Sequence, residues 1–248
     1  MNNIINTFLI GIFFGTFGTT IGGIIGIIIK KNSNKFLGTI LSFASGLMIA
    51  IVCFDLIPEA MDISNVTNVI VGILFGIFIM ILCYYIVQKK INNNLNNRIN
   101  NNSLLKTGII VSIGLAIHNF PEGLAIGSGF GASIVLGYSL AIAICMHDIP
   151  EGISMAIPLK NGGMSKIKIL FYVILSGVTT GIGSLVGVLI GGISQSVISI
   201  CLSFAAGAML YIVSGELIPE SNKLYSGKLN AIANIVGIII GLFAINVT

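Results

Sequence analysis

The sequence predicts an all-α integral membrane protein with eight transmembrane helices in a 3+2+3 inverted-repeat arrangement. Three observations predict this fold. The mean hydropathy is +1.05 over 248 residues and only 8% of them are charged, which is outside the range of soluble domains. The basic residues fall in alternate loops, and one stretch of the chain is repeated.

Eight apolar segments are long enough to cross a bilayer, which takes about 20 residues each. They are 4–29, 36–57, 66–88, 106–127, 133–157, 168–191, 195–218 and 229–247. The first lacks a basic region before it and is too long for a signal peptide, so we expect it to span the membrane. We treat 1–248 as a single transmembrane domain with one sizeable loop, the asparagine-rich segment 89–105, expected to be flexible and cytoplasmic.

The charges predict the topology. All 12 Lys and Arg residues lie in the loops that follow the first, third, fifth and seventh segments. Because positive loops stay in the cytoplasm, we expect both termini to be extracellular and the protein to be a multi-pass protein of the plasma membrane. The net charge of +4 is therefore a topology signal and does not indicate nucleic acid. The chain has no nucleotide-binding motif.

Four runs of the form polar-x-x-Pro-Glu hold most of the chemistry. They begin at Asp55, His118, His147 and Glu216, and they contain seven of the eight acids and both histidines. Ionisable side chains inside apolar segments are costly, which makes them candidates for function. The stretch from Ser42 to Glu59 matches the stretch at 203–220 at a constant offset of 161 residues. These segments are five spans apart and run in opposite directions, as in a secondary transporter.

The two central motifs predict a metal site. On a helix, positions i and i+4 share a face, so His118 pairs with Glu122 and His147 with Glu151. Each proline also frees a backbone carbonyl one turn earlier. Counting residues from the segment ends puts both motifs near the bilayer centre. A shared divalent cation would offset the cost of burying these acids, and His with carboxylate suits zinc or ferrous iron, with manganese or cadmium less certain.

Several roles stay open at this point. His147 could be a ligand, a partner of Asp148 or a proton carrier. Met48 is either a core side chain that fills a gap or a soft ligand. The outer motifs put one acid pair, Asp55 and Glu59, at the external mouth and another at the cytoplasmic mouth, namely Glu216 and Glu220. These four acids are either a cation path or solvated helix ends.

The runs His118-Asn-Phe-Pro-Glu122-Gly and His147-Asp-Ile-Pro-Glu151-Gly resemble the signature of the ZIP (Zrt-, Irt-like) metal transporters, and the bacterial GufA-like branch fits best. The resemblance covers the whole chain. It implies a binuclear centre with a primary site at His118, Glu122 and Glu151, close to Met48. Asn119 and Asp148 would join a second site.

The resemblance also implies an elevator-like motion, in which spans 1, 4, 5 and 6 slide against spans 2, 3, 7 and 8. One departure concerns the second site. The branch usually carries Ser-Gly-x-x-Glu-Pro in the sixth span, where this chain has Ser176-Gly-Val-Thr-Thr180-Gly. Because a hydroxyl adds no charge, we expect the second metal to bind weakly or not at all.

The sequence therefore predicts a secondary transporter that imports a divalent transition metal, zinc above others, into the cytoplasm. The ion is its substrate, and we expect no catalytic cofactor. The alternative is an intramembrane metalloenzyme, but each acid follows a proline and no separate base or nucleophile is evident, so we expect no enzyme activity. The expected partners are divalent metal ions and the lipid bilayer. Homodimerisation is left open.

Overall fold

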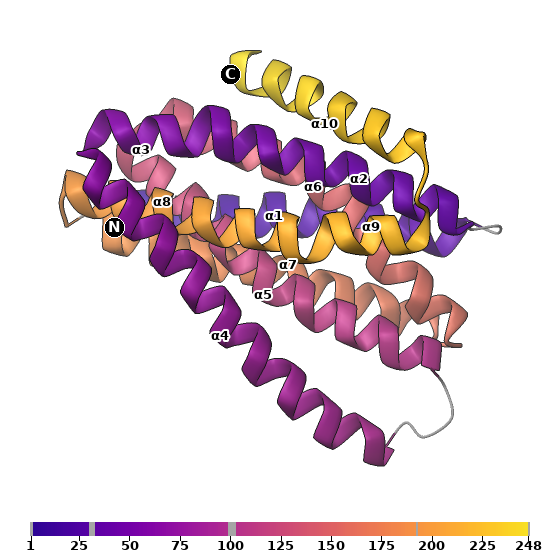
Figure 1. Ribbon diagram of the computed structural model, residues 1–248. Coiled ribbons are helices and arrows are strands. Elements are labelled where there is room, and N and C mark those ends of the chain that lie inside the picture. The colour runs from indigo at the N-terminus through magenta and orange to yellow at the C-terminus, as the bar shows by residue number, and fades with distance from the viewer. Residues whose placement is uncertain (1, 30–32, 99–102, 192, 248) are drawn as a thin grey trace.

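The computed structural model describes residues 2–29, 33–98, 103–191 and 193–247, and within these ranges it contains helices and no β-strand (Figure 1). The helices are α1 Asn2–Ile28, α2 Asn34–Ile51, η1 Val52–Leu56, α3 Ile57–Ile63, α4 Val66–Arg98, α5 Ser103–Ala132, α6 Ile134–Asn161, α7 Lys166–Gly191, α8 Gln195–Ile212, η2 Val213–Leu217, α9 Ile218–Leu224 and α10 Lys228–Val247. The two η elements are π-helical turns that join α2 to α3 and α8 to α9 into continuous spans. The described chain thus has eight helices long and apolar enough to cross a membrane, which confirms the predicted class.

Several of the predicted spans are longer than expected, among them the two that carry the outer motifs. The segments 36–57 and 195–218 continue as helices to Ile63 and Leu224. Pro58 and Pro219 stand in the first turn of α3 and of α9. Because the π-helical turns make these spans continuous, each proline lies in a helix interior, where its missing N–H leaves one carbonyl of the preceding turn without its helical partner. The outer Pro-Glu pairs therefore lie inside helices and not beyond their ends.

The prediction of a loop over 89–105 is wrong for most of its length. Helix α4 continues to Arg98 and α5 begins at Ser103, while 99–102 lie outside the described residues. Asparagine is a weak helix former, but a helix that is already nucleated adds each further residue at little cost. Helix α4 can therefore extend beyond its apolar segment. The extension could not be predicted from the pattern of apolar residues, because the added residues are mostly polar.

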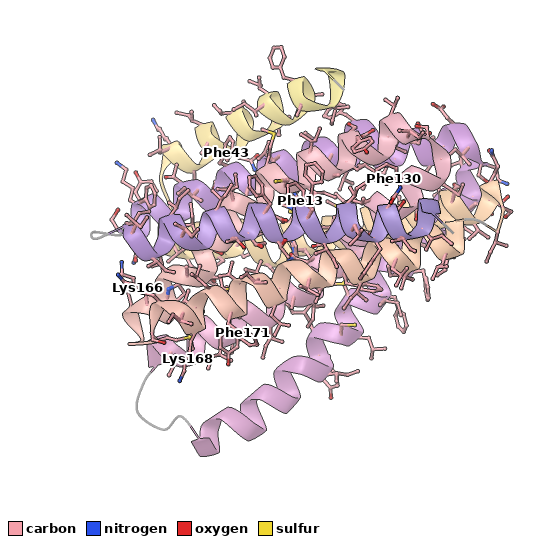
Figure 2. The ribbon with its side chains drawn as sticks, turned by 180° about the vertical axis from the view of Figure 1, so that it is seen from behind. Phe13, Phe43, Phe130, Lys166, Lys168 and Phe171 are labelled. Atoms are coloured by element: carbon pink, nitrogen blue, oxygen red, sulfur yellow. The ribbon has the colours of Figure 1, made fainter. Side chains whose placement is uncertain are left out.

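The flanks of the bundle are apolar and its polar side chains gather at the ends. Large side chains such as Phe13 of α1, Leu74 of α4 and Phe243 of α10 are 56–67% exposed. Figure 2 shows Phe13 and Phe171 along the flank, whereas Lys166 and Lys168 lie at one end. Exposed apolar flanks of this extent match a lipid environment.

The helices form two groups that are each held together by close glycine contacts. We name α1, α5, α6 and α7 the central-motif group, and the remaining helices the repeat group. A Cβ atom on Gly123 of α5 would lie 1.9 Å from the carbonyl oxygen of Thr180 on α7. In the repeat group, a Cβ on Gly46 of α2 would lie 2.0 Å from the carbonyl of Asn234 on α10. Only glycine permits such backbone approaches.

Contacts across the boundary between the groups are looser. For three of the described glycines, Gly114, Gly131 and Gly191, the atom nearest to an added Cβ belongs to the other group. The distance from that Cβ to the nearest atom is 3.5–3.8 Å. This is ordinary van der Waals separation. The backbones are therefore locked within each group, and side chains separate one group from the other.

The repeat group contains the same packing twice. Gly46 of α2 faces Asn234 of α10, and Gly207 of α8 faces Ile73 of α4. Gly207 lies 161 residues after Gly46, and Ile73 lies 161 residues before Asn234. The contact between Phe43 and Gly237 has its counterpart at 204 and 76, at the same offset. The helix lengths of 18, 5 and 7 residues are also equal in the two copies.

Candidate metal centre

Helices α5 and α6 bring both central motifs together. The Nε2 atom of His118 lies 2.9 Å from Oε1 of Glu122, one turn along α5, and 2.9 Å from Oε1 of Glu151 on α6. From the other side, Nε2 of His147 lies 2.7 Å from the same Glu122 oxygen. One potential ligand atom from each of the four residues lies within 4.8 Å of the other three. We name these four residues the His/Glu cluster.

The cluster is closed off from solvent, and some of its polar atoms have no hydrogen-bond partner. Its four residues are at most 1% exposed. Nevertheless, Oε2 of Glu122 and Oε2 of Glu151 accept no hydrogen bond. Buried carboxylate oxygens without a partner are costly, so a compensating cation or proton is needed at this position.

The donor set fits a transition-metal ion. Four ligands at the usual zinc distances in a tetrahedron lie about 3.3 Å from one another. The contacts of 2.7–2.9 Å in the cluster are close to this spacing, so small side-chain movements would suffice to hold an ion. Imidazole nitrogen with carboxylate oxygen is a set that suits zinc and iron, while calcium and magnesium prefer oxygen alone.

The three residues expected at a second site lie beside this cluster, and all are fully buried. Asn119 donates its amide to the backbone carbonyl of Ser176 on α7 at 3.1 Å, which leaves its Oδ1 without a partner. An Oδ1 atom of Asp148 lies 3.6 Å from His147, but neither oxygen of Asp148 accepts a hydrogen bond. The hydroxyl of Thr180 also has no partner. Helix α1 covers this region, with Gly15 against Thr180 and Gly18 against Asp148.

Met48 lies in a different environment. It is fully buried in the apolar core that also contains Ile144 and Met209. Met209 stands at the repeat position of Met48, 161 residues later, and is equally buried. The geometry thus accounts for both methionines as core side chains, and a ligand role for Met48 stays a prediction.

The acids of the outer motifs are not part of the cluster. Asp55 and Glu59 are half-buried, and Asp55 is hydrogen-bonded to Ser139 of α6. Glu216 is half-buried, whereas Glu220 is exposed and lies 3.4 Å from Lys223. An exposed pair of this kind contributes little to stability.

Sequence reasoning missed the residues that support the cluster. Ser176 orients Asn119, and nothing in the local sequence indicates that pairing. Gly123 and Gly152 directly follow the two cluster glutamates and let α7 and α1 approach the motif backbone. Their signal was present, since the central runs read Pro-Glu-Gly and the outer runs do not.

Eight apolar spans around a buried cluster of metal-type donors define an integral membrane protein that handles cations. Residues 90–247 match the ZIP zinc transporter family. Proteins called zinc transporter ZupT in Salmonella paratyphi A, Salmonella newport and Salmonella heidelberg are 32% identical to this chain over 216 residues, which is 83% of each sequence.

The chain therefore belongs to the ZIP zinc transporter family. It is a multi-pass protein of the plasma membrane that transports divalent metal ions, and it is not an enzyme.

Proposed function

We propose that this protein imports zinc into the cytoplasm, and that the ion passes through the His/Glu cluster near the middle of the membrane. The observation that carries this proposal is the meeting of four buried ligand atoms from two helices within 4.8 Å. The relatives are named zinc transporters, which supports zinc as the substrate. Iron, manganese and cadmium are the competing ions that the donor set also admits.

The primary ligands in this proposal are His118, His147, Glu122 and Glu151. Asn119 and Asp148 would form a weaker second site in which the two glutamates bridge. Thr180 supplies only a neutral hydroxyl to that site. Two glutamates balance one divalent cation, so the primary site is neutral when it is loaded and the histidines are uncharged.

The direction of transport follows from the topology that we propose. The loops that carry the basic residues would face the cytoplasm, and both termini would lie outside. Asp55 and Glu59 then stand at the external mouth, where negative charge attracts cations, and Glu216 and Glu220 stand at the cytoplasmic mouth. The α2–α3 and α8–α9 spans would be inverted copies, an inference supported by the shared 161-residue offset of their contacts.

Transport would proceed by sliding of the central-motif group against the repeat group. This elevator motion is supported by the glycine contacts, which lie at 1.9–2.9 Å within groups and at 3.5–3.8 Å across the boundary. Two bodies that are each rigid and that meet through side chains can move relative to each other with little backbone change. Homodimerisation stays a prediction.

The experiment that tests the proposal is uptake of radiolabelled zinc into proteoliposomes that contain the purified protein. We expect saturable uptake, and competition by unlabelled zinc at lower concentrations than by manganese or magnesium. The control is the His118→Ala/His147→Ala double variant, which retains both glutamates but loses both nitrogen ligands. Uptake no greater than in protein-free liposomes, from wild-type protein that is folded, would overturn the proposal.

A further inference from the structure

Two tyrosines pack against each other in the apolar core, and one of them, Tyr84, lies within electrostatic range of the His/Glu cluster and of Glu216. Tyr84 of α4 and Tyr211 of α8 have ring centroids 6.1 Å apart and ring planes inclined at 59°. Both rings pack against the apolar core. Tyr84 interacts electrostatically with Glu151 of the cluster and with Glu216, and Glu216 interacts in turn with His118. Tyr84 is therefore within electrostatic range of the acids at both ends of the proposed inner half of the path, and Tyr211 packs beside it.

Tyr84 also reaches across the boundary between the two groups. A Cβ atom on Gly114 of α5 would lie 3.8 Å from the Tyr84 hydroxyl oxygen, and it would meet no other atom beyond its own helix within 4 Å. Gly114 precedes His118 by four residues, so both lie on one face of α5. The hydroxyl of Tyr84 thus stands one helical turn from the cluster, on the side of the N-terminal end of α5.

The fold itself does not require these tyrosines. The 161-residue offset between the two copies of the repeat group makes Ala50 the counterpart of Tyr211. By the same offset, Ile245 is the counterpart of Tyr84. The same packing is thus built there with a methyl group and an aliphatic side chain. Aromatic rings occupy this level in one half only, which points to a role in transport beyond packing.

We propose that Tyr84 and Tyr211 form the inner barrier of the transport path, which separates the His/Glu cluster from Glu216 and the cytoplasm. The proposal rests on the import function and on the topology given above. The two rings belong to the repeat group and Gly114 belongs to the central-motif group. Sliding of one group past the other therefore breaks the contact between Tyr84 and α5, and this movement would open the inner half of the path.

The test measures access to Gly114 directly. Its Cβ position is free of close contacts, so Gly114→Cys fits the structure. The substitution is placed in a chain whose four cysteines, Cys53, Cys83, Cys145 and Cys201, are replaced by serine or alanine. A membrane-impermeant thiol reagent is applied from the cytoplasmic side of oriented vesicles. We expect labelling to be about twofold to tenfold faster with Tyr84→Ala, the range set by loss of one aromatic contact.

The matched control is Tyr85→Ala, which removes a neighbouring ring that is 63% exposed on the flank of α4. It should leave the labelling rate unchanged, and Tyr211→Ala should accelerate labelling as Tyr84→Ala does. Equal labelling rates with and without the Tyr84 and Tyr211 rings would overturn the proposal. If Tyr84→Ala fails to fold, Tyr211→Ala carries the test.

Zinc binding by the purified variants, measured by calorimetry, separates this proposal from the import function. The tyrosine variants should bind as much zinc as the wild type. A wild type that binds no zinc contradicts the import function, whereas the labelling comparison still decides whether the tyrosines form a barrier.

Discussion

The central and outer Pro-Glu motifs share one sequence pattern but adopt different structures. Helices α5 and α6 remain α-helical through Pro121 and Pro150. In the outer copies, a π-helical turn precedes Pro58 and Pro219. A π-turn changes which residues share a face, and such turns are frequent at functional sites. In the central motif of α5, the i, i+4 spacing brings His118 to 2.9 Å from Glu122.

The residue after each Pro-Glu differs in the same way. Gly123 and Gly152 follow the central glutamates, and a Cβ atom on either would lie within 2.2 Å of a carbonyl oxygen on α7 or α1. Ala60 and Ser221 follow the outer glutamates. Close approach of the neighbouring helix buries the central acids completely, whereas the outer acids stay half-buried or exposed. The glycines after the central glutamates thus admit the backbones of α7 and α1 at the two motifs that form the cluster.

The largest expected effect separates the glutamates of the two regions. Glu122→Gln and Glu151→Gln keep the side-chain size but remove the charge that would balance a divalent ion. Removal of a hydrogen-bond partner of a metal ligand lowers metal affinity or activity about 10–100-fold. Removal of a ligand itself should therefore lower zinc uptake by more than about 100-fold. Radiolabelled uptake at matched protein amounts measures this.

The control for that prediction is Glu220→Gln, which occupies the same place in an outer motif. We expect it to change uptake by less than about fivefold, because the side chain is exposed and its charge is screened. Equal losses in Glu122→Gln and Glu220→Gln would remove the distinction between central and outer motifs.

The second prediction concerns the glycine that follows a central glutamate. Gly123→Ala forces a methyl group against the Thr180 carbonyl and should destabilise the protein by about 1–3 kcal/mol, the usual cost of overpacking. Gly131→Ala is the control on the same helix, because its nearest neighbour lies at 3.6 Å. Thermal unfolding in detergent compares the two variants. A Gly123→Ala variant as stable as Gly131→Ala would show that α5 and α7 can separate without cost.

The third prediction tests the external mouth. Asp55→Asn and Glu59→Gln should raise the KM for external zinc about threefold to fivefold with little change in kcat, because these acids concentrate cations by long-range attraction. The difference from wild type should shrink in high salt. Asp62→Asn is the control, since it removes an exposed acid near the end of α3 that lies outside the motifs. A fall in kcat that salt does not alter would instead place Asp55 and Glu59 in the rate-limiting movement.

The smallest expected effect lies at Thr180. Thr180→Glu adds a carboxylate beside Asn119 and Asp148, so bound zinc should rise from about one ion per chain towards two, since a second dication then balances four acids. Thr180→Gln has nearly the same volume without the charge and should stay near one. Native mass spectrometry at saturating zinc counts the ions. Two ions in the wild type, or an unchanged count in Thr180→Glu, would contradict the prediction.

Much of the site could be predicted from the sequence because its signals are local. Spacing of four residues on a helix predicted a pair between His147 and Glu151, whereas His147 lies 2.7 Å from Glu122 of α5. The same spacing is enough to pair His118 with Glu122. It does not determine which residue of one helix meets which residue of the other. The contact between Nε2 of His118 and Glu151, and that between His147 and Glu122, depend on the packing of α5 on α6. Ser176 and Tyr84 escaped prediction for the same reason.

By itself, the sequence determined the class of the protein and the number of its spans, because the transfer of apolar side chains out of water depends on composition and segment length. It also determined the four polar-x-x-Pro-Glu motifs and their 161-residue repeat. Only the tertiary structure decided which of these motifs form a cluster and which contain a π-turn. Identical proline spacing gave both outcomes, because the burial of an acid depends on which helices pack against its motif: at the central motifs Gly123 and Gly152 meet the backbones of α7 and α1, whereas the outer acids stay half-buried or exposed.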